Sequence, residues 1–365
     1  MKQLTLTLAA SLLMLLQACT AGKLNEPSTK INKAENFTFQ LSESVTREKV
    51  VFKNRYGITI AGHLYVPKNM DKTKKYAALV LSGPFGAVKE QSSGLYANEM
   101  AKRGFIALAF DPSFTGESGG AVRNVASPDI FTEDFSAAVD YLGLQSYVDR
   151  NKIGALAICG LSGMAITAAA TDSRIKAVAT ASMYDMSRSI SKSYKDSYTK
   201  EQRHKILENL SQQRWIDAEK GTYALGFHEI PFNENGDLVK GDQLLPEKLP
   251  ENPDPVSADF HSYYKTKRGY HSRSINSNTA WTATTPLSFF SFPMYANLDL
   301  LAPRPILLIA GENAHSRYYS EDVYKIATGP KELIIVPGAT HCDLYDKVAL
   351  IPFDQLDTFF TLHLK

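Results

Sequence analysis

The chain has 365 residues, of which 44% are hydrophobic and 21% are charged, a composition typical of a globular protein with a sizeable core. This composition excludes disorder over most of the chain, and a formal net charge of +2 gives no electrostatic footprint for nucleic acid. Three cysteines are too few for a disulfide framework.

The N-terminus has the pattern of a secretory signal, because Lys2 precedes a short apolar run that cannot span a bilayer. The sequence Leu-Gln-Ala-Cys at residues 16–19 resembles the bacterial lipobox, whose cysteine becomes the lipidated first residue of the mature protein. We therefore predict a signal peptide over residues 1–18, lipidation of Cys19 and a flexible tether over residues 19–45. The expected location is the bacterial cell envelope, on the outer-membrane or periplasmic side. An ordinary cleaved signal on a secreted or soluble periplasmic protein is the alternative.

The body, residues 46–365, alternates strand and helix. Short apolar runs predict buried strands at 77–81, 105–110, 153–158, 175–181, 305–310 and 333–336. Helices are predicted between and after them, at 91–103, 130–142, 160–171, 321–327 and 353–364. Two β-branched segments around Tyr56-Gly57 predict a leading hairpin. The pattern indicates an α/β fold, with a mostly parallel sheet, helices on both faces and antiparallel strands at one edge.

Residues of about 186–297 break this alternation. They contain both tryptophans, many tyrosines and several prolines. We interpret this segment as a cap inserted between two strands of one domain, and its aromatic content favours a small-molecule substrate with an apolar or ring portion. A free-standing second domain is the alternative.

A strand, a tight glycine-containing turn and a small-residue helix meet near residue 159, as in a nucleophile elbow. Cys159 directly follows the apolar run 153–158. Ser162 nearly matches the centre of a G-x-S-x-G pattern, but it requires the strand to continue through Gly160. Strand length favours Cys159, and a thiol at a helix N-terminus beside a histidine is readily ionised. Ser162 stays open as the nucleophile, and a buried inert thiol is the non-catalytic interpretation of Cys159.

The nucleophile needs a histidine base and an acid that orients it. Both are expected at the ends of the later strands, because parallel sheets bind ligands there. His341 follows the last apolar run, where an elbow enzyme needs its base. Glu312 follows the penultimate run and Asp185 follows the run 175–181, and the sequence does not choose between these two acids.

The bend at residues 82–86 is a candidate oxyanion site, because it follows the first parallel strand. Pro84 has no N–H group, so Phe85 is the expected donor. The N–H of Gly160, next to the elbow cysteine, would be the second donor.

Together these features resemble the α/β-hydrolase superfamily, and most closely its dienelactone-hydrolase-like branch. The resemblance covers about residues 48–362. It rests on Gly83-Pro84-Phe85-Gly86, Lys89-Glu90-Gln91, Asp111 with Gly116 and Ser118, Ile158-Cys159-Gly160, and the Gly-Ala-Thr-His-Cys-Asp-Leu-Tyr segment at 338–345. That branch carries its cysteine nucleophile in G-x-C-x-G-G, which implies the same role for Cys159. Ala157 and Leu161 replace two of those glycines, and Ala314 stands at the family's usual acid position.

The sequence therefore predicts a hydrolase of ester, thioester or lactone carbonyls. It would form a covalent acyl-enzyme on Cys159 with His341 as base, and it would need no metal or organic cofactor. A serine esterase using Ser162 and an acyltransferase using the same intermediate are alternatives. A catalytically weak ligand-binding lipoprotein on a hydrolase scaffold is the alternative from another class. We expect no nucleic-acid partner, and contact with the membrane through the lipid anchor alone.

Overall fold

A computed structural model describes residues 36–364 of the chain. The predicted signal peptide, Cys19 and most of the tether lie outside the described residues. The last part of the predicted tether belongs to the folded unit, which begins at Asn36. The Thr38 N–H donates to the Glu90 carbonyl at 3.1 Å, and the Phe39 ring packs 6.5 Å from that of Tyr65. The predicted start of the body at residue 46 was therefore too late, because these aromatic rings cover the sheet before the first strand.

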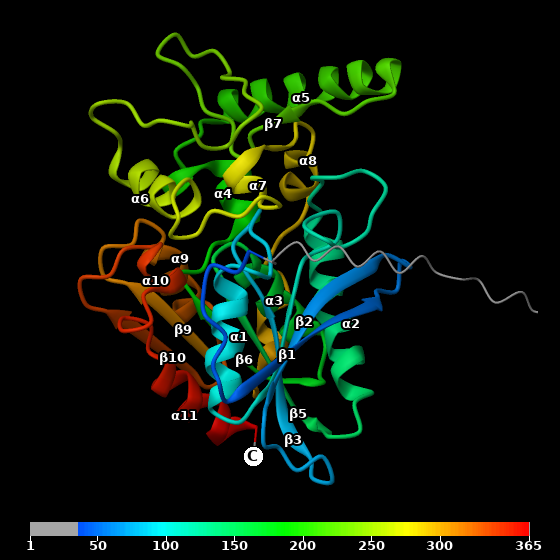
Figure 1. The fold of residues 1–365 in the computed structure, drawn as a ribbon. Helices are drawn as coiled ribbons and strands as arrows, with labels where there is room; N and C mark the ends of the chain where they lie inside the picture. Colours follow the sequence, from blue (N-terminus) through cyan, green and yellow to red (C-terminus); the bar gives the residue numbers. More distant parts are fainter. Residues whose placement is uncertain (1–35, 365) are drawn as a thin grey trace, which may run out of the picture. The chain divides into compact units, whose positions relative to one another are not determined.

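An eight-stranded sheet forms the centre of the folded unit (Figure 1). Its strands are β1 (Val45–Lys53), β2 (Thr59–Pro67), β3 (Tyr76–Ser82), β4 (Ile106–Phe110), β5 (Val148–Ile158), β6 (Ile175–Ala181), β9 (Ile306–Gly311) and β10 (Lys331–Val336). The order across the sheet is β1-β2-β4-β3-β5-β6-β9-β10. β1 and β2 pair antiparallel, as does β2 with β4, and the other neighbours are parallel. The predicted α/β class and the antiparallel edge are confirmed.

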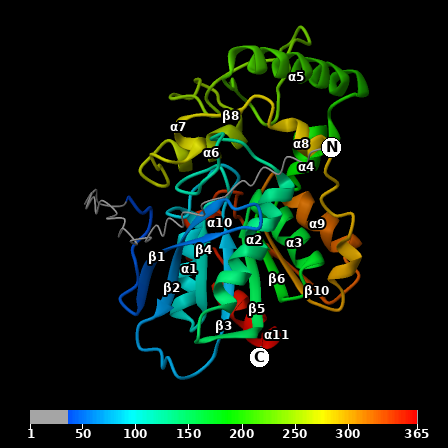
Figure 2. The ribbon, with the colours of Figure 1, turned by 90° about the vertical axis from the view of Figure 1, so that its right-hand side faces the viewer.

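Helices cover both faces of the sheet, as Figures 1 and 2 show. These helices are α1 (Ser92–Lys102), α2 (Pro128–Gly143), α3 (Leu161–Thr171), α9 (Arg317–Ile326), α10 (Asp343–Asp346) and α11 (Phe353–His363). Alternate residues of β3 enter opposite cores. Ala78 and Val80 pack with apolar residues of α2, α3 and α9, whereas Leu79 and Leu81 pack with those of α1 and α11. Burial on both faces explains why these strands are continuously apolar in the sequence.

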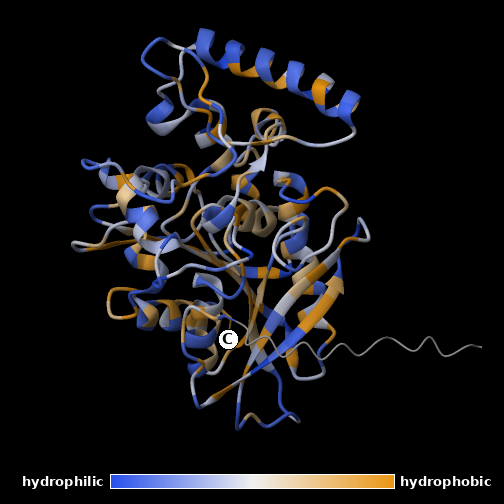
Figure 3. Ribbon diagram, turned by 45° about the horizontal axis from the view of Figure 1, so that its top comes forward, coloured by the Kyte–Doolittle hydropathy of each residue, from blue (hydrophilic) through white to orange (hydrophobic). Residues whose placement is uncertain are grey.

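The segment predicted as a cap lies between β6 and β9 in the chain and above the sheet in Figure 1. It contains α4 (Met186–Lys192), α5 (Lys200–Lys220), α6 (Pro255–Tyr264), α7 (Ile275–Asn278), α8 (Pro286–Phe290) and the short pair β7 (Leu225–Gly226) and β8 (Trp281–Thr282). Trp281 is fully buried there, whereas Trp215 on α5 is 69% exposed. Figure 3 shows α5, across the top, as mostly hydrophilic. In the part of the chain that the structure describes, no helix is long and apolar enough to cross a bilayer.

Candidate active site

Cys159 occupies the turn between β5 and α3. Its φ of 57° lies in the left-handed region, which a non-glycine residue adopts only at a cost of about 1–3 kcal/mol. The next residue must be small, because a Cβ on Gly160 would stand 2.5 Å from the Phe85 Cβ. The turn therefore directs one side chain away from the sheet and brings the backbone of residue 160 close to the loop that contains Phe85.

The Cys159 thiol is 6% exposed and faces two backbone N–H groups and one hydroxyl. Burial raises the pKa of this thiol to about 11, although the Tyr345 hydroxyl and the N–H groups of Gly160 and Phe85 oppose the rise. The thiol is therefore neutral at physiological pH, contrary to the ready ionisation expected from its helix N-terminus. The two N–H groups are those that the sequence predicted as oxyanion donors.

Ser162 lies one turn further along, inside α3. Its side chain is fully buried, and its hydroxyl lies 3.2 Å from the Ala157 carbonyl, to which it donates. β5 ends at Ile158, so the strand does not continue through Gly160 as a serine elbow would require.

His341 lies in the loop after β10, and its ring is fully buried. Nδ1 is 2.6 Å from the Ser316 hydroxyl, and Nε2 is 2.8 Å from the Tyr345 hydroxyl. In the tautomer that can act as a base at Nε2, the ring proton resides on Nδ1 and is donated to Ser316, and Nε2 accepts from Tyr345. Burial, and secondarily His315, lower the pKa of His341 well below its usual value. The ring is therefore neutral in the resting site.

Neither acid predicted as the partner of His341 makes that contact. Asp185 is the N-cap of α4 and accepts the Arg188 N–H at 2.9 Å. Glu312 accepts the Gly338 N–H at 2.8 Å, at an exposed position. Asp185 caps its own helix and Glu312 holds the turn after β10, and a neutral hydroxyl, that of Ser316, bonds to the histidine instead.

The loop that carries Phe85 is fastened by a segment of the cap. The Phe85 carbonyl accepts from the Asn276 side-chain amide at 2.8 Å. The carbonyl of Gly86 accepts from the Ile275 N–H at 2.8 Å and from the Ser274 hydroxyl at 3.0 Å. Gly86 has a φ of 87°, and a Cβ there would meet the Asn276 side chain at 2.5 Å. The cap thus fixes the orientation of the oxyanion loop.

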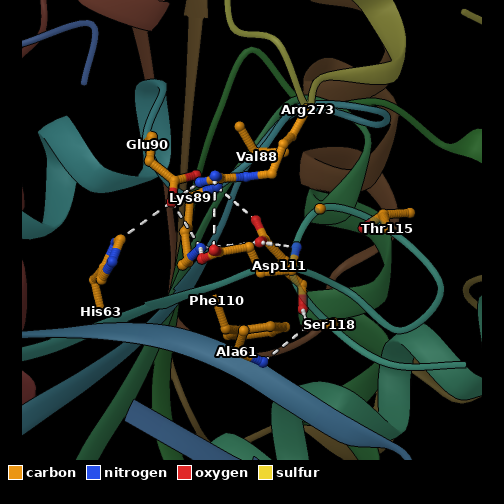
Figure 4. Close-up of polar contacts among 12 residues, drawn as sticks. Ala61, His63, Val88, Lys89, Glu90, Phe110, Asp111, Thr115, Ser118 and Arg273 are labelled. Atoms are coloured by element: carbon orange, nitrogen blue, oxygen red, sulfur yellow. Dashed lines mark hydrogen bonds and ion pairs between the residues drawn. The ribbon is translucent and has the colours of Figure 1, made fainter. Parts of the chain in front are cut away.

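A buried ion network lies beneath the same loop (Figure 4). Lys89 Nζ is 2.7 Å from a Glu90 oxygen and 3.1 Å from an Asp111 oxygen. It is also 2.6 Å from Glu117, while Arg273 of the cap lies 2.6 Å from Glu90. Burial opposes the charge on Lys89, but the carboxylates of Asp111 and Glu90 outweigh burial and raise the pKa of Lys89. Lys89-Glu90-Gln91 is thus structural, and Lys89 remains charged because three carboxylates surround it.

Replacing Lys89 with methionine is expected to lower the free energy of unfolding by roughly 3–5 kcal/mol, because the fully buried Asp111 carboxylate loses the cation that lies 3.1 Å from it. Urea denaturation measures the change. Lys102→Met is the matched control, since the Lys102 side chain is 40% exposed and its partner Glu99 also pairs with Arg103 at 3.0 Å. That control is expected to cost less than about 1 kcal/mol. Equal losses in the two variants would show that the buried network contributes no more than a surface pair.

A cavity of about 800 Å³ lies over Cys159, between the sheet and the cap. Its aromatic lining includes Phe85, Tyr184, Phe227, Phe260, Tyr264 and Tyr345. Of the described residues that line it, Glu229 and Asp254 are acidic and none is lysine or arginine. The space fits an uncharged group with an apolar or ring portion better than an anion.

The raised pKa of Cys159 predicts slow alkylation at neutral pH. Native protein is expected to react with iodoacetamide at a rate that rises about tenfold per pH unit up to about pH 10, because only the thiolate reacts. Mass spectrometry of the Cys159 peptide follows the reaction separately from Cys342. The urea-unfolded chain is the control, since its thiol regains the ordinary pKa of 9.0 and its rate levels off about two pH units earlier. A native rate that is already constant from pH 7 to 9 would contradict this assignment.

Sequence reasoning missed Ser316, His315 and a role for Tyr345. His315 bonds to the Tyr184 hydroxyl, and its ring lies 4.9 Å from that of His341. Tyr345 follows His341 by four residues, a spacing that puts both on one side of a helical turn and could have revealed it. Ser316 and His315 follow the predicted acid position in the chain, and only the packing of their loop against His341 identifies them.

The chain is similar to known proteins in both sequence and structure. No protein-family model matches the sequence. The Pseudomonas aeruginosa protein PA2218 is 56% identical over 327 residues, which cover 90% of this chain and 83% of that protein. Its crystal structure superposes with a TM-score of 0.83 over 90% of this chain and 97% of the other. The Escherichia coli protein YcjY is 33% identical over 306 residues, which cover 83% of this chain and 94% of YcjY.

Two more distant similarities bear on the fold and the chemistry. The crystal structure of the α/β hydrolase GrgF from a Penicillium species is 21% identical, with a TM-score of 0.69, and covers 87% of this chain and 99% of the other. This likeness supports the fold. The thiohydrolase aneE of Aspergillus aculeatus is 32% identical over 137 residues, which cover 38% of this chain and 42% of that protein.

Proposed function

The chain belongs to the family of PA2218 and YcjY and has the α/β-hydrolase fold, and on that premise we propose that it hydrolyses thioesters or activated esters through an acyl intermediate on Cys159. One observation carries the proposal. The Cys159 sulfur lies at a strand-to-helix turn on the floor of an aromatic cavity, with two backbone N–H groups and one hydroxyl directed at it. A buried inert thiol has no need of that arrangement.

The sulfur attacks the carbonyl carbon of the substrate while the thiol proton passes to His341. The carbonyl oxygen becomes an oxyanion that the N–H groups of Phe85 and Gly160 stabilise, each donor contributing roughly 3–4 kcal/mol. Collapse of this intermediate expels the leaving thiol or alcohol, which takes the proton from His341. Water then attacks the acyl–Cys159 thioester by the same route and releases the acid.

The substrate class follows from the weakness of the base. Among the described residues no carboxylate hydrogen-bonds to His341, and burial lowers its pKa, so it assists proton transfer less than a histidine paired with aspartate. Thiols and phenols leave with little proton assistance, whereas amines and alkoxides need much more. Thioesters and aryl esters are therefore the favoured substrates. The partial similarity to a protein named a thiohydrolase supports the same class.

The acyl portion is expected to be neutral and apolar or aromatic, because the described cavity lining is aromatic and carries no lysine or arginine. The cysteine at the elbow supports a mechanism like that of the dienelactone-hydrolase-like branch. A carboxylate-bearing acyl group, however, would find acidic side chains in place of a cation.

The purified full-length protein, kept in reductant, should hydrolyse S-phenyl thioacetate and 4-nitrophenyl acetate. Acid quenching within the first turnovers should leave an acetyl group on the Cys159 peptide, detected by mass spectrometry. A wild type that turns over neither substrate and acquires no acyl group would overturn the proposal and favour the ligand-binding alternative. An acyl-enzyme that releases product only when an alcohol or amine acceptor is added would identify an acyltransferase.

We also propose that the protein is attached to the cell envelope through lipid on Cys19, as the lipobox-like residues 16–19 suggest. The folded unit begins at Asn36, which leaves a polar segment to connect anchor and enzyme. Expression in a bacterium with radioactive palmitate should label the wild type and not Cys19→Ala. Equal labelling of both would exclude this site.

A further inference from the structure

We propose that Tyr345 carries the proton between Cys159 and His341 and is a catalytic residue of this site; the inference rests on the proposed cysteine mechanism. The Tyr345 hydroxyl is 2.8 Å from His341 Nε2. Tyr345 and Cys159 both line the cavity, and this hydroxyl lowers the pKa of the thiol. It therefore lies between the nucleophile and the base.

The positions of the three side chains relative to the cavity support this order. Cys159 and Tyr345 line the cavity, whereas His341 is fully buried and is not among the lining residues. A substrate bound over Cys159 meets the phenol and not the imidazole. The base thus reaches the reacting atoms through the hydroxyl of Tyr345.

The phenol is fixed in place by packing on several sides. Tyr345 belongs to the one-turn helix α10, and its ring lies 5.3 Å from that of His341 at 71°. The Tyr263 ring of the cap packs 5.0 Å from it, edge to face. Arg268, also from the cap, bonds to the Cys342 carbonyl at 2.8 Å and to Asp346 at 2.6 Å, on either side of Tyr345 in the chain. A rigid hydroxyl of this kind is suited to proton transfer, which depends on short, fixed distances.

The proposed step moves two protons in one direction. As the sulfur lone pair forms the bond to the carbonyl carbon, the S–H proton passes to the Tyr345 oxygen. The Tyr345 O–H proton passes at the same time to His341 Nε2. The π pair of the carbonyl moves to its oxygen, and the reverse transfer protonates the leaving thiol or alcohol as its bond to carbon breaks. Tyr345 is regenerated in each half-reaction, and water repeats the sequence in deacylation.

The electrostatics of the site favour a relay through a neutral group. Both the thiol and the imidazole are buried, and a resting thiolate and imidazolium would be costly there. Concerted transfer through the phenol creates charge only as the oxyanion forms, where the N–H groups of Phe85 and Gly160 receive it. The buried base can therefore serve the nucleophile without forming an ion pair in advance.

Tyr345→Phe tests the relay, because it removes one oxygen and keeps the ring. We expect kcat on S-phenyl thioacetate to fall on the order of 100-fold, the range of general acid–base assistance. Tyr96→Phe is the matched control. Its buried hydroxyl donates to the Leu344 carbonyl at 2.7 Å, so it removes one hydrogen bond beside the same turn without touching the cavity. We expect the control to retain kcat within about threefold. Thermal unfolding of both variants verifies that they fold.

The dependence of kcat on the deuterium fraction in mixtures of H2O and D2O would not change if Tyr345 had a purely structural role. The wild type should show a curved dependence of kcat on the deuterium fraction, as two protons in transfer require, and Tyr345→Phe should lose that curvature. A Tyr345→Phe variant as active as the wild type, or a loss equal to that of Tyr96→Phe, would overturn the relay while leaving the cysteine mechanism intact. Failure of the proposed function would instead appear as a wild type that forms no acyl-enzyme.

Discussion

Cys159→Ala should lower kcat on thioesters and aryl esters by at least about 1,000-fold and abolish the acyl-enzyme, because no other described nucleophile faces the oxyanion donors. The variant should fold normally. Alanine is smaller than cysteine, can adopt the left-handed conformation at this one position and leaves the buried contacts of α3 unchanged. Initial rates measured with the full-length protein under reductant, together with mass spectrometry of the 159 peptide, test the expectation.

Ser162→Ala is the matched control, since it removes the hydroxyl of the competing elbow assignment. It is expected to keep kcat within about threefold, and to reduce stability by about 1 kcal/mol through loss of the hydrogen bond to the Ala157 carbonyl. The opposite pattern, with Cys159→Ala active and Ser162→Ala inert, would establish a serine esterase and refute the cysteine mechanism.

His341→Gln should lower kcat roughly 100- to 10,000-fold, because it removes the base that receives the thiol proton. The rate of Cys159 alkylation at pH 7, however, should change little. The resting thiol is neutral and its pKa is about 11, so no imidazolium holds it as a thiolate. Alkylation and turnover, measured on the same preparation, separate these two effects.

Ser316→Ala is the comparison for that variant. It deletes the partner of Nδ1 while keeping the ring, and a loss of about tenfold in kcat is expected from the loosened orientation of the imidazole. If His341→Gln instead slowed alkylation at pH 7 by 100-fold or more, a preformed thiolate–imidazolium pair would have to replace the neutral pair described above.

The sequence alone established the arrangement of the fold. The apolar runs at 153–158 and 175–181 coincide with the buried parts of β5 and β6, and the segment predicted as a cap lies between β6 and β9 in the chain. Local signals suffice there, because burial of a parallel strand on both faces requires an uninterrupted apolar run. The length of the run before Cys159 likewise placed that residue at the turn, since a strand that ends at Ile158 leaves no other residue there.

Tertiary structure decided the polar partners and the protonation of the site. Asp185 and Glu312 stand at plausible strand ends, yet each bonds to a nearby backbone N–H, and His341 is held by Ser316 and Tyr345. Which groups form a hydrogen bond depends on loop packing to within a few tenths of an ångström. The position of a residue at the end of a strand does not determine its hydrogen-bond partner. The raised pKa of the thiol also depends on tertiary structure, because desolvation by burial outweighs the opposing effects of Tyr345, Gly160 and Phe85, and only the assembled fold determines how much water reaches Cys159.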